Sequence, residues 1–315
     1  MYLCFDVGGT SVKAGIIDES GTIIIKRKIP TVTGDVQAMV SRLQEGSSTL
    51  CEEAQISKSA IKAVGVGIPG FVQEETGLIT KAVNLGWENV PIADLLSVSL
   101  GHPVCVINDA NAAALGEMWR GAGRGQKNLL CLTIGTGIGA GVIINERIHN
   151  GIHGLAGEIG HFRVRPEEGR LCNCGRIGCL ETESSASAIA FYGEEAVKQG
   201  KAPLLAEALK RDGEVTSRSV AEAAVQGEEA ALEIYNRSAY YLGFALSNIF
   251  SVLAPEKMII GGGAAEAGNL LFTPLIESFN RFIFTDVKGE DLIVPALLGN
   301  DAGIVGLAYL AHTVA

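Results

Sequence analysis

A short segment near the start of the chain recurs near its middle. Residues 3–19 (LCFDVGGTSVKAGIIDE) and 130–146 (LCLTIGTGIGAGVIINE) align without gaps at an offset of 127 residues, and six of the seventeen positions are identical. Each copy is an apolar run, a turn rich in glycine and threonine, and a second apolar run, which is the pattern of a β-hairpin. The repeat therefore predicts a chain built from two related halves.

The sequence after each copy alternates between helical and extended patterns. In the first half we expect helices over 35–54 and 110–119, and strands over 63–68 and 104–107. In the second half we expect helices between 219 and 253, over 270–282 and up to about residue 312, and strands over 258–260 and 292–297. Such alternation predicts an α/β protein with mostly parallel sheets covered by helices.

The chain is long enough for two domains with hydrophobic cores, since 47% of its 315 residues are hydrophobic. We expect a small α/β domain formed by residues 1–113 and 300–315, and a large α/β domain formed by residues 114–299. No Pro- or Ser-rich linker separates the halves. The two domains are therefore expected to share a cleft.

Charge and hydropathy restrict the partners of the chain. The formal net charge is −10 and no window supplies a basic cluster, which argues against binding to nucleic acid. The longest apolar stretch, 240–255, is interrupted by Ser247, Asn248 and Ser251 and is too short for a membrane span. Seven cysteines and the absence of a signal-peptide pattern favour a reducing, cytoplasmic location. Small molecules are the expected partners.

Three glycine-rich turns are candidate phosphate-binding sites. Gly8-Gly9-Thr10 and Gly135-Thr136-Gly137 lie in the two repeats, and Gly261-Gly262-Gly263 follows an apolar strand. Their backbone N–H groups can donate to phosphate oxygens, which come close because glycine has no Cβ. A single such turn is more often a plain tight turn, but three in one chain favour a nucleotide. Neither the P-loop nor the Rossmann glycine pattern is present.

Two aspartates stand beside these turns. Asp6 directly precedes the first turn, where its carboxylate can hold Mg²⁺ opposite the phosphates; the alternative is a turn cap. Asp109 follows an apolar strand and precedes a helix, where α/β proteins often place ligand-binding groups. It could accept the proton of a hydroxyl that attacks a γ-phosphate, but Asn108 and Asp109 also form a good helix cap.

Three closely spaced cysteines, Cys172, Cys174 and Cys179, predict a metal site. Two residues in Cys-x-Cys spacing cannot easily form a disulfide with each other, whereas Gly175 and Gly178 allow the sharp turns that let three sulfurs converge. His161, eleven residues before the first of them, is a candidate fourth ligand. Three thiolates and an imidazole would complete a closed, tetrahedral, structural zinc site.

Together these motifs resemble the ROK family of sugar kinases and related repressors, and within it the bacterial-type glucokinases. The resemblance runs in order along nearly the whole chain. It rests on Asp6-Val7-Gly8-Gly9-Thr10, Gly65-Val66-Gly67-Ile68-Pro69-Gly70, Asn84-Leu85-Gly86-Trp87, Asn108-Asp109-Ala110-Asn111, Gly135-Thr136-Gly137-Ile138-Gly139, Glu158-Ile159-Gly160-His161, Cys172-Asn173-Cys174-Gly175-Arg176-Ile177-Gly178-Cys179-Leu180-Glu181 and Asp301-Ala302-Gly303.

The resemblance implies an actin-like (ribonuclease H-like, duplicated) two-domain fold and the activity of an ATP:hexose 6-phosphotransferase. Asp109 would be the general base toward the sugar 6-hydroxyl, with ATP, Mg²⁺ and structural Zn²⁺ as cofactors. His161 would bind zinc through one ring nitrogen and a sugar hydroxyl through the other. The sugar would be bound by Gly67, Asn84, Asn108, Asp109, Glu158, His161 and Glu181. ATP would be held by Asp6, Gly8, Gly9, Thr10, Lys13, Gly135, Thr136, Gly137, Gly261, Gly262 and Gly263.

Other functions remain as alternatives. N-acetylmannosamine, N-acetylglucosamine, fructose or allose could replace glucose, because the same residues can bind several hexoses. A non-catalytic sugar-sensing protein is the alternative outside the enzymes, although it predicts the loss of Asp109 or of the ATP turns, and neither is lost. A DNA-reading helix-turn-helix is not expected, because the first hairpin starts at residue 2. Apolar side chains within 228–253 favour a homodimer or homotetramer.

Overall fold

The computed structural model describes residues 1–315, except for the side chain of His153. The chain divides into two compact units. The first comprises Met1–Cys131, Gly141–Gly157 and Leu297–Ala315, and the second comprises Leu132–Ala140 and Glu158–Ala296. The domain boundaries expected from the sequence, 1–113 with 300–315 for the small domain and 114–299 for the large one, stay a prediction. Among the described residues, no helix is long and apolar enough to cross a membrane.

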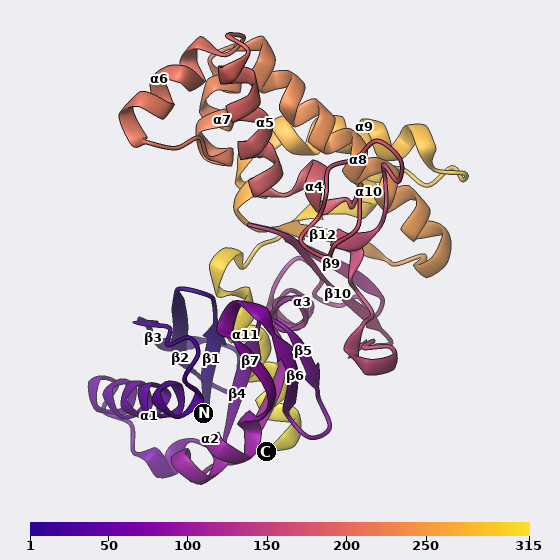
Figure 1. Cartoon of the computed structure of the whole chain (residues 1–315). Helices are drawn as coiled ribbons and strands as arrows, with labels where there is room; N and C mark the ends of the chain where they lie inside the picture. Colours follow the sequence, from indigo (N-terminus) through magenta and orange to yellow (C-terminus); the bar gives the residue numbers. More distant parts are fainter. The chain divides into compact units, whose positions relative to one another are not determined.

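The first unit is built on a five-stranded sheet with the order β3-β2-β1-β4-β8 (Figure 1). Its strands are β1 (Tyr2–Val7), β2 (Ser11–Ile17), β3 (Ile23–Pro30), β4 (Ala63–Ile68) and β8 (Val104–Asn108). β1 and β2 form the antiparallel hairpin predicted from the first repeat, with Tyr2 opposite Ile17. β1, β4 and β8 are parallel, so Asp6 and Asn108 lie at the same edge of the sheet.

A second five-stranded sheet has the order β11-β10-β9-β12-β13. Its strands are β9 (Leu129–Ile134), β10 (Ile138–Ile144), β11 (Arg147–Ile148), β12 (Lys257–Gly261) and β13 (Ile293–Pro295). The repeat forms β1 and β2 in the first sheet and β9 and β10 in the second. In each sheet the next strand of the chain, β3 or β11, pairs with the second strand of the repeat. Two later strands, β4 and β8 or β12 and β13, follow on the side of the first strand of the repeat. The equivalent strand orders agree with the duplication predicted from the repeat.

Helices and a small sheet complete the first unit. They are α1 (Val36–Glu53), α2 (Ile92–Leu100), α3 (Asp109–Arg120) and α11 (Ala302–Val314), with the sheet β5 (Phe71–Gln73), β6 (Leu78–Ala82) and β7 (Trp87–Pro91). α1 packs against β2, β3 and α2. α11 packs against β1, β4 and α3, so the helix at the end of the chain covers the strand at its beginning (Figure 1).

α3 and α11 touch through their backbones. A Cβ atom on Gly116 would overlap the carbonyl oxygen of Ala302, and one on Gly306 would overlap the carbonyl oxygen of Ala112. Since neither glycine carries a side chain, the two helices can approach this closely. The contact fixes the first residue of α3, Asp109, relative to the start of α11.

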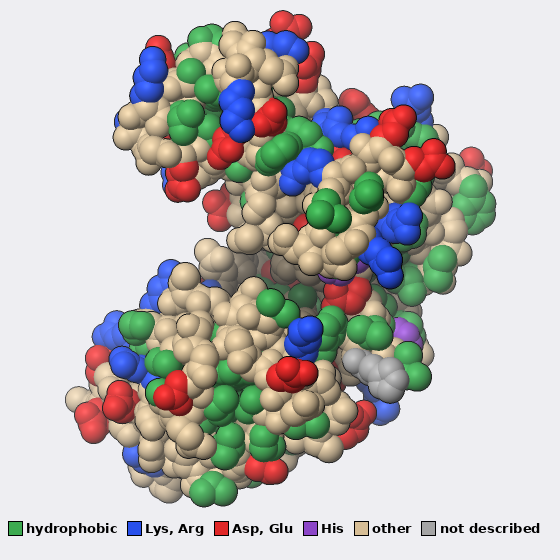
Figure 2. All heavy atoms as spheres, viewed as in Figure 1, with side chains coloured by type: hydrophobic (Ala, Val, Ile, Leu, Met, Phe, Trp, Pro, Cys, Tyr) green, Lys and Arg blue, Asp and Glu red, His purple; other side chains and the backbone are tan. Residues whose placement is uncertain are grey.

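Most of the second unit is helical. Its helices are α4 (Glu181–Ser184), α5 (Ala186–Lys198), α6 (Pro203–Asp212), α7 (Ser217–Val225), α8 (Glu229–Leu253), α9 (Asn269–Phe282) and α10 (Gly289–Leu292). α8 packs along α9, and α4, α5 and α7 pack against α8. Basic and acidic side chains are mixed over α5, α6 and α7 on the face that Figure 2 shows, as on an ordinary solvated surface.

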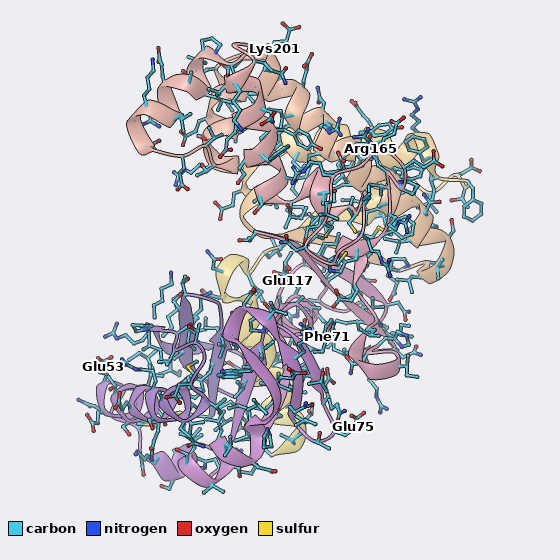
Figure 3. The ribbon with its side chains drawn as sticks, viewed as in Figure 1. Glu53, Phe71, Glu75, Glu117, Arg165 and Lys201 are labelled. Carbon is cyan, nitrogen blue, oxygen red and sulfur yellow. The ribbon has the colours of Figure 1, made fainter. Side chains whose placement is uncertain are left out.

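The structure confirms the long predicted elements and changes one short one. The strand expected over 292–297 is limited to Ile293–Pro295. Leu292 ends the helical turn α10, and the N–H groups of Leu297 and Leu298 donate to the carboxylate of Glu117 at 3.1 and 2.8 Å, so they cannot extend the sheet. Figure 3 labels Glu117. The elements that were not predicted are β3, α2, the sheet β5-β6-β7, β11 (Arg147–Ile148) and the helices α4, α5, α6 and α10.

Candidate active site

A cavity of about 640 Å³ opens at the edge of the first sheet where Asp6 lies. Carboxylates and lysines share its wall. The lining residues are Asp6, Val7, Gly8, Ser11, Lys13, Lys26, Arg27, Lys28, Asp109, Asn300 and Asp301. The cavity thus brings Asp109 together with Asp6, Lys13 and Gly8, the first residue of the first predicted phosphate turn.

The carboxylate of Asp6 is closely surrounded. A Cβ atom on Gly303 would lie 2.5 Å from its Oδ2, and one on Gly67 would lie 3.5 Å from its Oδ1. Burial raises the pKa of Asp6 to about 6, the charge of Asp109 adds to the rise, and Lys13 opposes it. Burial and the neighbouring Asp109 make ionisation of Asp6 costly. A cation bound between the two carboxylates would offset this cost, so the site suits a cation.

Asp109 begins α3 and lines this cavity. Its Oδ1 accepts a hydrogen bond from the N–H of Ala110 at 2.9 Å. Burial raises the pKa of Asp109, and this hydrogen bond opposes the rise. A carboxylate whose pKa is raised toward neutrality is a stronger base than an exposed one, which is the property that proton abstraction from a hydroxyl needs.

Basic residues from β2 and β3 face the aspartates. Lys13 and Lys28 are directly opposite each other in the β2–β3 register. Asp301 compensates part of this repulsion, because it lies 3.9 Å from Nζ of Lys13 and 2.5 Å from Nζ of Lys26. Burial lowers the pKa of Lys13, while Asp6 and Asp301 oppose the shift. The sequence prediction missed Lys26 and Lys28, although an exposed Lys-Arg-Lys run on a strand was a visible signal.

The remaining first-unit candidates lie at turns. The N–H of Gly8 donates to Ser11 O at 3.0 Å, and the N–H of Thr31 donates to Thr10 O at 3.1 Å, which holds the first predicted phosphate turn. A Cβ atom on Gly9 would lie 4.0 Å from the Cβ of Asn84, so the predicted phosphate turn and the predicted sugar residue are neighbours.

Asn108 has a structural task in this unit. Its Oδ1 accepts from the N–H groups of Ala110 and Asn111 and caps α3, and its Nδ2 donates to Gly70 O at 3.1 Å. The amide therefore orients the helix that begins with Asp109 and also ties it to the loop after β4. A sugar contact by Asn108 stays a prediction.

The second unit brings together the four predicted metal ligands. One ligand atom from each of His161, Cys172, Cys174 and Cys179 lies within 4.8 Å of the others. The Cys174 and Cys179 sulfurs are 3.6 Å apart, and Cys172 Sγ lies 3.7 Å from His161 Nδ1. Zinc–sulfur bonds of about 2.3 Å in a tetrahedron place sulfurs about 3.8 Å apart, so the donor set fits zinc.

The geometry of the loop agrees with the metal prediction. Gly175 and Gly178 have φ angles of +81° and +76°, as the predicted sharp turns require. Burial raises the pKa of Cys179 to about 12, and the neighbouring sulfurs add to the rise. Thiolates are the form that binds a metal ion, so metal binding to this cluster releases protons.

The imidazole of His161 presents its two nitrogens to different partners. Nδ1 faces Cys172, whereas Nε2 lies 3.8 Å from Oε2 of Glu158. With Nδ1 directed at the metal position, Nε2 and the Glu158 carboxylate form an adjacent donor and acceptor. Both side chains are more than a third exposed, at 38% and 43%, and are accessible to a small polar molecule.

A buried carboxylate, Glu183, anchors the metal-binding loop. It accepts hydrogen bonds from Arg237 and Tyr192 and lies 3.5 Å from Arg165, which belongs to the loop between His161 and Cys172 and is labelled in Figure 3. A buried charge needs such partners, because an unpaired one is very costly. The sequence prediction missed Glu183, which stands only two residues after Glu181.

The other two glycine turns also lie in the second unit. Gly135-Thr136-Gly137 joins β9 to β10, and Glu181 accepts a hydrogen bond from the next residue, Ile138, at 3.0 Å. Gly263 lines a cavity of about 610 Å³ beside α7. Its other lining residues, which the sequence did not reveal, are Arg218, Ala221, Glu222, Val225, Gln226, Tyr235, Glu266 and Ala267.

Comparisons with known proteins agree with these features. The family model described as "ROK family" matches residues 2–314. A glucokinase of Halalkalibacterium halodurans is 42% identical over 310 residues, which cover 98% of this chain and 94% of that protein. The crystal structure of a ROK family glucokinase from Streptomyces griseus in complex with glucose and AMPPNP is similar with a TM-score of 0.84 and 34% identity, covering 99% of each chain.

A regulator is similar as well. The crystal structure of a ROK family transcriptional regulator, a homologue of the E. coli MLC protein, has a TM-score of 0.88 and 26% identity, covering 99% of this chain and 78% of that chain. These likenesses confirm the predicted α/β class and the actin-like fold. On its motifs, its fold and these matches, the chain belongs to the ROK family.

Proposed function

We propose that this protein is an ATP-dependent hexose kinase that phosphorylates the 6-hydroxyl of glucose. The observation that carries the proposal is the pairing of Asp109 with Asp6 and Lys13 around one cavity. This arrangement offers a base for a hydroxyl next to groups that suit a phosphate and its metal ion. The identity with the H. halodurans glucokinase supports the same reaction.

Asp109 is the general base of the proposed reaction. Its carboxylate accepts the proton of the sugar 6-hydroxyl as that oxygen bonds to the γ-phosphorus of ATP. The bond between the γ-phosphorus and the bridging oxygen breaks, and ADP leaves. Burial keeps the carboxylate poorly solvated and raises its pKa, which strengthens it as a base.

Each unit, taken by itself, contains candidate partners for phosphates. Lys13 supplies positive charge, and the turns at Gly8–Thr10, Gly135–Gly137 and Gly261–Gly263 supply N–H donors. Asp6 would hold Mg²⁺, which neutralises charge on the transferred phosphoryl group when it is bound. The cavity beside Gly263 is large enough for a nucleoside, and we assign the adenosine of ATP to it.

The metal cluster has a structural role in this proposal. His161, Cys172, Cys174 and Cys179 would hold zinc as a closed site, with no open position for substrate. The imidazole is thereby fixed with Nε2 beside Glu158, and both are candidate partners of sugar hydroxyls. Glu181 and Asn84 are further sugar-binding candidates. All seven cysteines have free thiols, which suits the reducing cytoplasm, and we place the enzyme there. We expect it to form a homodimer or homotetramer.

A coupled assay of ADP release tests the proposal. Purified protein with MgATP should release ADP with glucose faster than with N-acetylmannosamine, N-acetylglucosamine, fructose or allose. A different preferred sugar would correct the substrate and keep the kinase. The regulator likeness makes a sugar-sensing protein the second candidate. Sugar binding detected by calorimetry without ADP release from any sugar of the panel would favour that second candidate.

A further inference from the structure

The turn Gly135–Gly137 and the metal cluster are in direct contact within the second unit. Ile138, which follows the turn, donates its N–H to Oε2 of Glu181 at 3.0 Å, and the other carboxylate oxygen, Oε1, lies 3.7 Å from Sγ of Cys172. One carboxylate therefore touches a metal ligand on one side and the backbone of the proposed phosphate turn on the other. From the sequence, Glu181 is expected only as a sugar-binding residue.

Glycine at position 137 is what allows this contact. A Cβ atom there would overlap Oε2 of Glu181. Gly135, in the same turn, is different, because a Cβ atom there would meet no atom within 4 Å. The two glycines of the turn thus provide a matched pair, of which only one contacts the carboxylate.

Two further contacts join the same segments. Gly160, the neighbour of His161, packs so closely on the carbonyl oxygen of Ile138 that a Cβ atom would overlap it. Beyond the metal ligands, the N–H of Ala186 donates to the carbonyl oxygen of Gly135 at 2.8 Å. The residues on both sides of the metal cluster hence hold the turn from both ends.

We propose that zinc bound by the cysteine cluster positions the Gly135–Gly137 turn through Glu181, so that the metal and the phosphates of a nucleoside triphosphate stabilise each other's binding. Glu181 is in this sense a positioning residue for the nucleotide. The inference rests on the proposed function for the identity of the nucleotide. Because binding free energies are linked, the factor by which zinc strengthens nucleotide binding equals the factor by which nucleotide strengthens zinc binding.

Zinc release measures the coupling without any need for turnover. A chromogenic chelator removes zinc from the purified protein, with excess Mg²⁺ and with or without saturating AMPPNP. We expect AMPPNP to slow zinc release about 5- to 150-fold, the range usual for coupled sites. Equal rates with and without AMPPNP would overturn the inference.

Alanine variants of the two glycines test whether the coupling passes through Glu181. Gly137→Ala should release zinc about 10- to 100-fold faster than wild type, as is usual when a contact to a metal ligand is lost. Gly135→Ala should release zinc at the wild-type rate. Similar rates for the two variants would contradict a path through Glu181.

Glu181→Ala removes the carboxylate that contacts both the turn and Cys172. This variant tests the inference even if Gly137→Ala does not fold. It should abolish the slowing of zinc release by AMPPNP, and slowing at the wild-type level would overturn the inference.

The kinase proposal and this inference can fail independently of each other. A protein with coupled zinc release but no ADP release contradicts the kinase, whereas an active kinase without coupling contradicts only this inference.

Discussion

Asp109 accepts a hydrogen bond at the start of α3 and is also the proposed base. A single substitution can remove the second role and keep the first. Asn in its place keeps the shape and an oxygen that can accept from Ala110, but it cannot take a proton. We expect Asp109→Asn to lower kcat about 100- to 10,000-fold, the usual contribution of a general base. The Kd for sugar, measured by calorimetry, should stay near the wild-type value.

The surface carboxylate Asp212 is a suitable control. It is exposed and pairs with its neighbour Arg211 in the second unit. Asp212→Asn should leave kcat unchanged. Turnover by Asp109→Asn at a rate close to that of this control would remove the base assignment.

Asp6 gives the stability of the ligand-free protein a specific dependence on pH. Its pKa is about 6 in the folded protein and 3.8 as a free side chain, so the folded state binds a proton more readily than the unfolded state does. Its contribution to the free energy of unfolding is therefore fully present below pH 3.8 and is lost as the pH rises through about 6.

Asp6→Asn removes this titration. At pH 7.5 we expect the ligand-free variant to be more stable than wild type in urea unfolding by about 1 kcal/mol, less than the full shift implies because the carboxylate is only half-buried. The difference should shrink at pH 4, while the affinity for MgATP falls at both values. A stability difference that does not change with pH would show that Asp6 does not titrate in this range.

At the scale of elements, the backbone contact of α3 with α11 determines where Asp109 lies. A Cβ atom at position 306 would collide with a helix backbone, which cannot rotate away as a side chain can. Gly306→Ala should lower the free energy of unfolding in urea by about 1–3 kcal/mol, as overpacked cores do, and should lower kcat by moving Asp109.

The exposed end of the same helix provides the comparison. Val314 is 51% exposed, and Val314→Ala should change the free energy of unfolding by less than about 0.5 kcal/mol. Equal stability of the Gly306→Ala and Val314→Ala variants would mean that the helices can separate without cost.

The elements that could be predicted from the sequence are those whose order of apolar and polar residues follows their burial over many positions. β4 is buried along its whole length and was visible as an apolar run, and the 18 residues of α1 were visible as an amphipathic one. The three strands β5, β6 and β7 mix buried and exposed residues within three to five positions, too few to show a period. The end of β13 depends on Glu117, 180 residues earlier, which no local pattern contains.

The same distinction applies to the candidate site over the whole molecule. The clustering of the four predicted metal ligands was predictable because three of them lie within eight residues of each other. Asp301 and Lys26 are 275 positions apart, and only the packing of α11 on the first sheet brings them together. The cavity beside Gly263 likewise combines α7 with the turn after β12, so its residues could not be recognised before the fold was known.

Zinc is expected to support the whole enzyme through one small loop. Cys174 is the exposed cysteine of the cluster, so Cys174→Ser is the substitution least able to disturb a core. We expect it to reduce zinc below one ion per chain and to raise the KM for sugar about 10-fold or more, because Glu158 and His161 lose their support. Metal analysis and initial rates measure both effects.

Cys51 of the first unit supplies the matched thiol. It is free and lies in helix α1, outside the cluster. Cys51→Ala should retain one zinc per chain. An unchanged KM for sugar after complete metal loss from Cys174→Ser would separate the metal from sugar recognition.

The covering of β1 by α11 has a consequence for biosynthesis. A ribosome releases the first strand and its glycine turn long before it makes the helix that packs on them. Until then Asp6 lacks its neighbour Gly303, and Lys13 lacks Asp301. The faces of β1 and β4 on which α11 packs therefore have no cover until α11 is made, and the cavity lined by Asp6, Lys13 and Asp301 is complete only then.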